Sequence, residues 1–351
     1  MAPADGPPVM AHIVMADDGI AFDGRSVEAG PLGGAETAFV ALAEALAARG
    51  HRVEARSRCR APVAHNGVSW APLASGGPAS CDLLIANRGA GLLGLVSAAG
   101  RRLFWLHNPA RYLKKPRNLW PLARYRPTLV LCGEHHAGTV PSWLPCAGNV
   151  VMPYGLLAPF REAGPRNPPP PRAVFTSNPL RGFDWLLDLW AGHIAPAVPD
   201  AELHVYCGPA VYGVGGDTAR RMEAVLARVE ALHASGVRRH APVRHDELAA
   251  VLAQSRVMLY RGDPGEAFCT ALAEAQSMGL PVVVQPVGMV AERVVDGVTG
   301  SVAASDAAFA AAAIQLLRDD EMWRRFHTQA LARQRGLSWD EVAARYEALI
   351  G

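Results

Sequence analysis

The 351-residue sequence lacks several features that would restrict its function. No apolar run approaches the ~18 residues that a membrane-spanning helix needs. The Pro-rich start, residues 1–8, has neither the basic end nor the apolar core of a signal peptide, and we expect it to be disordered. The six cysteines form no CxxC pair, which disfavours both a structural zinc site and a disulfide framework. These absences predict a cytoplasmic protein.

Lysine is nearly missing, because it occurs only at Lys114 and Lys115. Any mechanism that needs a lysine elsewhere is therefore excluded, including that of a pyridoxal-dependent phosphorylase with its lysine in the second half of the chain. The sequence contains neither GxGxxG nor GxxxxGK[ST], so a dinucleotide fingerprint and a P-loop are absent. It also has no Asp-x-Asp metal motif. We expect no cofactor and no metal.

The overall composition is that of an ordinary globular protein. Half of the residues are apolar and 19% are charged, which excludes wholesale disorder. The formal net charge of +2 excludes a polycation that coats nucleic acid. The length corresponds to about two domains.

Short apolar runs alternate with amphipathic stretches along the chain, a pattern that predicts an α/β fold with parallel sheets covered on both faces. Predicted strands before residue 160 are Val9–Ala16, His51–Ala55, Asp82–Ala86, Arg102–Leu106, Thr128–Cys132 and Asn149–Met152. Predicted helices there are Gly34–Ala48, Gly91–Ala99 and Glu134–Trp143. Predicted strands after residue 172 are Ala173–Thr176, Glu202–Cys207, Val237–His240, Val257–Tyr260 and Pro281–Gln285. Predicted helices there include Phe183–Trp190, Thr218–His233, Asp246–Gln254, Glu266–Ser277 and Ala307–Leu317.

A Pro-rich segment at 161–172 separates the two halves. It holds five prolines and no apolar periodicity, which is typical of a semi-rigid linker, although a surface loop is the alternative. We therefore expect one doubly wound α/β domain at 1–160, a second at 173–335, and a final helix within 336–351. Such sheets bind ligands at the carboxyl ends of their strands, and two facing domains form a cleft.

Two motifs stand where loops lead into helices. Gly33-Gly34-Ala35-Glu36 combines a backbone that a ligand can approach closely with a helix N-terminus, which favours anions; a plain tight turn is the alternative. The second motif runs from Asp263 through Glu266, Phe268, Cys269 and Thr270 to Glu274. The amides of Phe268, Cys269 and Thr270 are expected in the first helical turn, where they could hold a phosphate.

The two glutamates of the second motif are eight residues apart, which places their backbones about 12 Å apart along a helix. Hydrolytic carboxylate pairs lie roughly 5–10 Å apart, so a glycosidase pair is disfavoured. Glu266 and Glu274 suit recognition of hydroxyls at two ends of an elongated ligand. The alternative is that Glu266 only complements the helix dipole and Glu274 is solvated.

With Gly279-Leu280-Pro281-Val282-Val283 and Asp296-Gly297-Val298-Thr299-Gly300 after it, the second motif resembles the signature of retaining GT-B glycosyltransferases of family 4. Gly33–Glu36, Pro153-Tyr154-Gly155 and His107 in Leu106-His107-Asn108-Pro109 resemble further motifs of that family, in the same order. The resemblance runs from about residue 9 to 350. It implies two Rossmann-like domains facing a cleft, an N-terminal acceptor domain, a C-terminal donor domain, and a last helix that crosses back to the first domain.

The resemblance also implies roles for individual residues. Gly33 and Gly34 would lie by the donor phosphates, and Glu266 would hold hydroxyls of the transferred sugar. Phe268, Cys269 and Thr270 would offer amides to the diphosphate, Glu274 would hold the ribose, and His107 would lie in the active site. Arg181-Gly182 matches the family's Lys-Gly, but Thr176 or Ser177 stands where the family has an additional arginine. One cation is thus missing, and Arg261 is a candidate replacement.

Charge is unevenly distributed along the first domain. No acidic residue occurs from Leu83 to Gly133, whereas this stretch holds nine basic residues interleaved with aromatic and aliphatic ones. It suits an anionic membrane surface or a phosphate-bearing acceptor, with a solvated basic face as the alternative. No nucleic-acid module accompanies it. Candidate contact residues are Arg111, Lys114, Lys115 and Arg117.

The sequence therefore predicts a retaining, metal-independent glycosyltransferase that uses a nucleoside diphosphate sugar, UDP in preference to GDP. Its acceptor would be a glycan, a glycolipid or another anionic molecule, reached in the cytoplasm or by peripheral contact with the inner face of the membrane. Two alternatives stay open. One is a sugar-nucleotide epimerase on the same fold, and the other is a non-catalytic nucleotide-sugar-binding protein, which the missing cation suggests.

Overall fold

The structure is a computed structural model that describes residues 10–213 and 215–350. The expected disorder of residues 1–8 lies outside this range. The described chain divides into two compact units. The first contains 10–26, 35–153 and 339–350, and the second contains Val27–Gly34 and Tyr154–Ser338. The Pro-rich segment 161–172 therefore belongs to the second unit.

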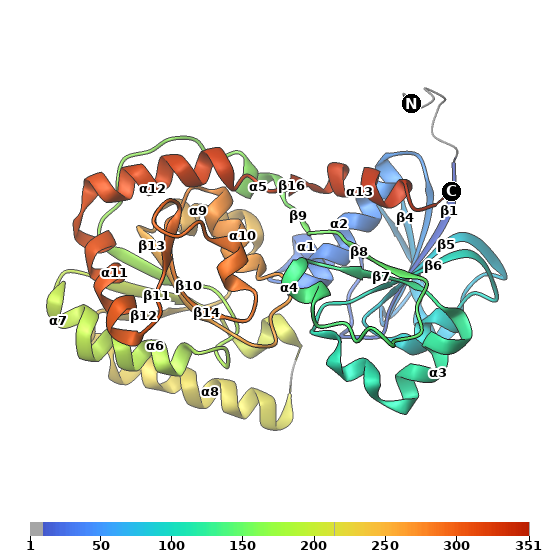
Figure 1. Cartoon of the computed structure of the whole chain (residues 1–351), viewed down its shortest axis with the longest axis horizontal. Helices are drawn as coiled ribbons and strands as arrows, with labels where there is room; N and C mark the ends of the chain where they lie inside the picture. Colours follow the sequence, from blue (N-terminus) through green and yellow to red (C-terminus); the bar gives the residue numbers. More distant parts are fainter. Residues whose placement is uncertain (1–9, 214, 351) are drawn as a thin grey trace. The chain divides into compact units, whose positions relative to one another are not determined.

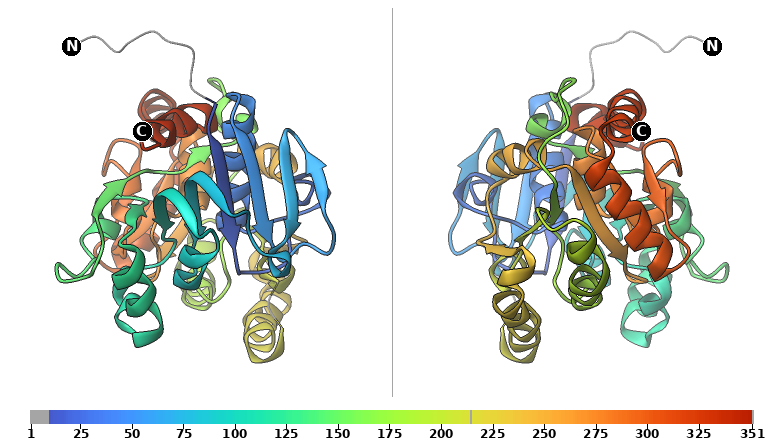
Figure 2. Two further views of the ribbon diagram at one scale, coloured as in Figure 1. Left: turned by 90° about the vertical axis from the view of Figure 1, so that its right-hand side faces the viewer. Right: turned by 90° about the vertical axis from the view of Figure 1, so that its left-hand side faces the viewer.

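The first unit is built on an eight-stranded sheet in the order β3-β4-β2-β1-β5-β6-β7-β8, seen from the side in Figure 2. All neighbouring strands are parallel except β3 and β4. The strands are β1 His12–Asp17, β2 Arg52–Ser57, β3 Val63–His65, β4 Val68–Pro72, β5 Ser80–Asn87, β6 Ala98–Trp105, β7 Thr128–Leu131 and β8 Gly148–Val151. The hairpin-like pair β3 and β4 was not predicted from the sequence.

Helix α2, Gly34–Ala48, has the predicted bounds and buries Phe39, Leu42 and Leu46. Of two other helix predictions in this unit, one was wrong and one extended too far. The segment 91–99 forms only a 3-10 turn, Ala90–Gly94, because the chain is already extended in β6 from Ala98, where it pairs with β5. Helix α4 spans only Glu134–Ala137 and is followed by Gly138 and Pro141, which favour termination. Helix α3, Pro116–Tyr125, also belongs to this unit, whereas the short α1, Ser26–Ala29, lies mostly in the second.

The second unit is built on a parallel six-stranded sheet in the order β12-β11-β10-β13-β14-β15. Helices α6 and α8 lie along one side of this sheet and α9 and α10 along the other (Figure 1). The strands are β10 Arg172–Phe175, β11 Glu202–Tyr206, β12 Val237–His240, β13 Val257–Gly262, β14 Val282–Val287 and β15 Gly300–Val302. The helices are α5 Ala158–Arg161, α6 Phe183–Leu189, α7 Ala195–Ala197, α8 Gly216–Ala231, α9 His245–Ala253, α10 Thr270–Ser277, α11 Asp306–Arg318 and α12 Asp320–Arg333.

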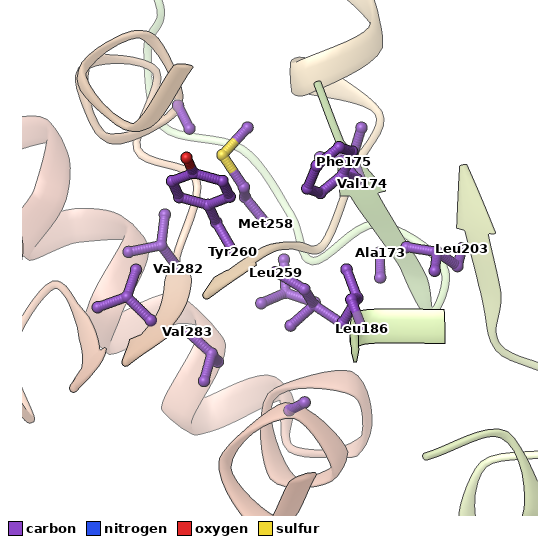
Figure 3. Packing of buried hydrophobic residues seen from close by; sticks show 14 of the residues in the cluster. Ala173, Val174, Phe175, Leu186, Leu203, Met258, Leu259, Tyr260, Val282 and Val283 are labelled. Atoms are coloured by element: carbon purple, nitrogen blue, oxygen red, sulfur yellow. The ribbon is translucent and has the colours of Figure 1, made fainter. Parts of the chain in front are cut away.

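The core of the second unit is formed by alternating side chains of its central strands. Leu259 of β13 packs toward Leu186 of α6, whereas Met258 and Tyr260 point to the other face (Figure 3). The fully buried aliphatic runs explain why these strands read as continuous apolar segments in the sequence.

One helix boundary in this unit changes the interpretation of the second motif. The predicted helix Glu266–Ser277 begins only at Thr270, because Cys269 has a left-handed backbone with φ of 58°. Glu266 therefore lies in the loop after β13, and the inference that Glu266 and Glu274 lie about 12 Å apart along one helix was wrong. The expectation that Phe268 lies in the first helical turn was also wrong, because Phe268 precedes the N-cap.

The last helix, α13 Trp339–Glu347, contacts the first unit, as expected. Arg49 at the end of α2 donates two hydrogen bonds of 2.7 Å to the Glu347 carboxylate, and His51 contacts the same group at 2.9 Å. A two-residue strand before the helix, β16 Leu337–Ser338, pairs with β9 Gly155–Leu156 in the second unit. Within residues 10–213 and 215–350, no helix is long and apolar enough to cross a membrane.

Candidate active site

Both sheets have a point where the strand order reverses, and polar side chains gather at each of them. In the second unit the reversal lies between β10 and β13. The loop after β10 carries Arg181, and the loop after β13 carries Glu266. In open α/β sheets, this carboxyl-end position is where ligands bind. The fold thus brings together two predicted residues that are far apart in the sequence.

Arg181 and Glu266 form an ion pair. Arg181 Nη1 donates to Glu266 Oε1, and the Glu266 residue is only 4% exposed. The second carboxylate oxygen, Oε2, is buried and has no hydrogen-bond partner among the described residues. Burial lowers the pKa of Arg181, but the facing carboxylate more than offsets this, so the pKa is raised and the guanidinium stays charged. A buried acceptor without a donor is costly unless a ligand supplies one.

The groups around this ion pair are neutral. Burial raises the pKa of the Cys269 thiol and of the Tyr212 and Tyr260 hydroxyls, and the negative charge near them adds to the effect. These three buried side chains next to the pair are therefore uncharged, and their low-dielectric environment strengthens electrostatic contacts with a bound anion.

Helix α10 begins beside this pair. Cys269 is its N-cap and Thr270 its first residue, so the leading N–H groups point out of the helix without intrahelical partners. Gly34 lies against Thr270, because a Cβ added to Gly34 would be 2.7 Å from Thr270 Oγ1. Phe268 is fixed in place by the Tyr154 ring at 4.4 Å and by Arg293, whose Nε donates to the Phe268 carbonyl at 2.9 Å.

Glu274 lies farther along α10 and is only 6% exposed, so the alternative of a solvated surface residue was wrong. Burial raises the pKa of its carboxyl from 4.5 to about 8. Such a group gains most from a ligand that donates hydrogen bonds to its ionised form.

The candidate replacement cation, Arg261, is rigidly held in the same unit. Its Nε donates to Gln285 Oε1 at 3.1 Å, and its guanidinium lies 5.2 Å from the centre of the Trp185 ring. The side chain runs past Gly182, where an added Cβ would be 3.0 Å from Arg261 Cβ. Arg261 is thus next to the Arg181-Gly182 loop.

In the first unit the strand order reverses between β1 and β5, and here the sequence reasoning missed three residues: Asp17, Asn87 and Arg88. Asp17 and Asn87 end these strands and are register partners. The fully buried Asp17 carboxylate accepts from the Gly19 N–H at 2.7 Å, from Asn87 Nδ2 at 2.5 Å and from Arg88 Nε at 2.8 Å. A polar residue at the carboxyl end of each predicted strand was the signal that could have identified them.

Two predicted residues join this network. Arg88 Nη2 donates to Oε1 of Glu36, the last residue of the Gly-Gly motif, at 2.8 Å. His107, just after β6, contacts Asn87 Oδ1 through Nε2 and packs on the Trp105 ring at 4.9 Å. Burial, followed by the charge of Arg88, lowers the pKa of His107 well below its usual value, so its imidazole is neutral. Gly33 is buried at the loop that leads into α2.

The four basic candidates Arg111, Lys114, Lys115 and Arg117 are all exposed, in and after the 3-10 turn Ala110–Lys114. The neighbouring Trp120 is 68% exposed. Because Arg117, Trp120 and Arg124 of α3 are three and four residues apart, they share one side of the helix. Among residues 10–213 and 215–350, no group of three or more His, Cys, Asp or Glu side chains could hold a metal ion.

Residues 170–319 match the family model described as glycosyl transferases group 1. The chain carries a glycosyl transferases group 1 domain. Its matched part contains Arg181, Glu266 and Glu274. This segment is thus similar to glycosyltransferases of group 1, and the solved structures described next show that the chain has a GT-B fold.

Solved structures of glycosyltransferases resemble the whole chain. Sucrose-phosphate synthase from Thermosynechococcus elongatus has a TM-score of 0.72 at 16% identity, covering 96% of this chain and 98% of that one. HepE from Anabaena, in complex with UDP-glucose, has a TM-score of 0.70 at 15% identity, covering 97% and 99%. WaaG, a glycosyltransferase involved in lipopolysaccharide biosynthesis, has a TM-score of 0.68 at 14% identity, covering 96% and 99%. No curated protein sequence matches the chain significantly.

Proposed function

We propose that this protein is a retaining glycosyltransferase that uses a UDP-sugar, in preference to a GDP-sugar, and transfers the sugar to an acceptor hydroxyl. The observation that carries the proposal is the Arg181–Glu266 pair at the strand-order reversal, inside the segment that matches the glycosyltransferase family. The complexes of HepE with UDP-glucose, and of the pneumococcal O-GlcNAc transferase GtfA with UDP and GlcNAc, support the choice of UDP.

In this proposal, the donor diphosphate lies between the start of α10 and Arg181. The guanidinium donors that do not face Glu266, together with the amides of Phe268, Cys269 and Thr270, stabilise the negative charge that grows on the leaving group. The buried Glu266 Oε2 accepts a hydrogen bond from a sugar hydroxyl, which removes the cost of its missing partner. Gly33 and Gly34 leave room beside the phosphates, and Glu274 accepts from the ribose hydroxyls.

The reaction breaks the bond between the anomeric carbon and the phosphate oxygen, and the electron pair leaves with the nucleoside diphosphate. The acceptor oxygen forms a new bond on the same face of the sugar, and its proton passes to the departing phosphate. Because arginine and amide donors supply the charge stabilisation, we propose that no metal is required. Full activity in the presence of EDTA is the expected result, and its loss with recovery on adding Mg²⁺ would contradict this point.

The decisive experiment combines nucleotide binding with transfer. We expect UDP to raise the melting temperature more than GDP, ADP or CMP does. Arg181→Gln should lower kcat by about 100-fold or more, the size of effect seen when a charge-stabilising donor is removed. Glu266→Gln should also lower kcat, because it removes the charge that pairs with Arg181 and weakens the acceptor for the sugar hydroxyl. Matched controls are Arg220→Gln and Glu223→Gln, which alter exposed residues of α8. Full transfer by Glu266→Gln would refute the assignment of this site.

We further propose that the exposed basic residues Arg111, Lys114, Lys115 and Arg117, with Trp120, bind an anionic membrane surface that presents the acceptor. A tryptophan beside cations suits the membrane–water interface. Flotation with vesicles that contain anionic lipid, which attracts basic residues near the surface, should recover the wild type but not Lys114→Ala/Lys115→Ala. Equal, weak flotation with neutral and anionic vesicles would refute membrane binding, and inhibition by soluble phosphate esters would then indicate a soluble anionic acceptor.

One alternative has a specific observation in its favour. Thr176 or Ser177, just after β10, stands where the family resemblance implies an additional arginine, so the chain could bind a nucleotide sugar without transferring it. UDP-sugar binding with no transfer to any acceptor, including water, would establish this alternative. A decrease in kcat in Arg261→Gln without loss of UDP affinity would argue against it, because it would show that Arg261 supplies the second charge.

A further inference from the structure

The network of the first unit contains an amide whose orientation is determined by its neighbours. Asp17 accepts hydrogen bonds from three donors, the Gly19 N–H, Arg88 Nε and Asn87 Nδ2. Burial raises the pKa of Asp17, but the Arg88 guanidinium and the Gly19 N–H, which do not depend on how Asn87 is oriented, both oppose this and favour a carboxylate, which can only accept. The amide nitrogen of Asn87 must therefore face Asp17.

The other end of the same amide determines the state of His107. Because Nδ2 faces Asp17, Oδ1 faces His107 and contacts its Nε2. An amide oxygen has no hydrogen to donate, so the hydrogen of this contact belongs to Nε2 of the imidazole. We propose that Asn87 is a positioning residue that holds His107 as a neutral imidazole protonated at Nε2, so that Nδ1 is its accepting nitrogen.

Independent contacts support a single orientation of the imidazole. The Trp105 ring packs on it at 4.9 Å with an angle of 49° between the ring planes. Burial and the nearby charges of Arg88 and His136 lower the pKa of His107, so a second ring proton is disfavoured near neutral pH. Asn87 and His107 are 20 positions apart in the sequence. They meet because β5 and β6 are neighbouring strands whose register pairs Asn87 with Trp105.

This assignment has a consequence for the proposed glycosyl transfer, and this step rests on that proposal. A neutral imidazole cannot supply positive charge to a departing diphosphate. Neutralisation of the leaving group would therefore depend on arginines such as Arg181.

The chain offers two internal references for measuring the tautomer. His327 accepts from the Arg166 N–H at Nε2 and contacts the Gly279 carbonyl through Nδ1, so it carries its hydrogen on Nδ1. His136 accepts from the Cys132 N–H at Nδ1 and contacts the Asn108 carbonyl through Nε2, so it carries its hydrogen on Nε2. In both, backbone groups determine which nitrogen is protonated.

The test is a long-range proton–nitrogen NMR spectrum of the full chain labelled with ¹⁵N-histidine, recorded without any substrate. Each reference signal, and that of His107, is assigned by its loss in the corresponding His→Gln variant. We expect the His107 ring to show the His136 pattern, with a protonated Nε2 and an unprotonated Nδ1. The His327 pattern, or two protonated nitrogens at neutral pH, would overturn the proposal.

Two substitutions separate positioning from a merely structural effect. Asn87→Asp keeps an oxygen toward His107, and because its other oxygen faces the Asp17 carboxylate the pair should share one proton; Nε2 should stay protonated. Asn87→Leu removes that oxygen, and exchange of the Nε2 hydrogen with water should become roughly tenfold faster. Unchanged exchange in Asn87→Leu would refute the role of Asn87. If this variant does not fold, the wild-type spectrum still decides the tautomer, and a failure of the transfer assay leaves this test intact.

Discussion

Removing the guanidinium of Arg88 tests the network in the first unit most directly. Arg88 bridges Asp17, whose side chain is fully buried, and Glu36, whose side chain is 9% exposed. In Arg88→Met, both carboxylates lose their cation while the chain keeps similar volume. Residue 88 has a left-handed backbone with φ of 55°. Because neither arginine nor methionine is glycine, the backbone strain is the same in the wild type and the variant and cancels when their stabilities are compared.

The expected size follows from burial. Removing one partner of a buried ion pair costs about 3–5 kcal/mol. Here the Arg88 side chain is 25% exposed, and Asp17 keeps the Gly19 and Asn87 donors. We therefore expect a loss of about 2–3 kcal/mol in the free energy of unfolding.

Native-state hydrogen exchange in urea is the appropriate assay, because exchange of the β1 and β5 amides reports on the first unit alone. The matched control is Arg228→Met, which removes an arginine paired with the exposed Asp184 and Asp188. It should cost about 0–1 kcal/mol. A loss in Arg88→Met no larger than in the control would refute the reasoning, as would a failure of Asp17→Asn to recover part of the loss in the double variant.

Four further predictions concern Glu274, Cys269 and Glu347. The Glu274 pKa of about 8 should fall when ribose hydroxyls donate to the carboxylate, so UDP binding at pH 7 should release protons. Calorimetry in two buffers of different ionisation enthalpy measures this release, and equal binding heats in the two buffers would contradict it. Since that pKa is raised above its unfolded value of 4.5, stability should fall as pH rises from 4.5 to 8 in the wild type but less in Glu274→Gln, measured by urea unfolding. Cys269→Gly should be about 1 kcal/mol more stable than Cys269→Ala, because only glycine adopts a φ of 58° without strain; equal melting temperatures would contradict this. The hydrogen bonds from Arg49 lower the pKa of Glu347, so docking of α13 should weaken as pH falls through that lowered pKa; amide exchange in α13 tests this, and Glu347→Gln should remove the pH dependence.

The local sequence pattern predicted most helices and strands correctly. It failed where contacts between distant residues, or an unusual backbone conformation, determine where an element begins or ends. Helix α2 has its predicted bounds because apolar side chains recur at helical spacing and a glycine follows the end. Helix α3 was not predicted, since Pro121 inside it disfavours a helix in a local reading. The start of α10 was misplaced because Ala267 and Phe268 look helical, and only the left-handed Cys269 shows otherwise.

The candidate site divides in the same way. The motifs that contain Gly34, Glu266 and Glu274 are visible as residue spacing, and so are the basic residues around Lys114. The partners of Glu266 and His107 are not, because they come from other loops and strands.

The sequence by itself determined the alternation of strands and helices, the glycosyltransferase motifs and the shortage of lysine. Tertiary structure alone decided the strand order, and the order determines which loops meet at each reversal. It therefore paired Arg181 with Glu266, joined Asp17 and Asn87 to His107, and buried Glu274. The physical reason is that periodicity records which face of an element is apolar, whereas pairing, burial and the resulting pKa values depend on neighbours that are distant along the chain.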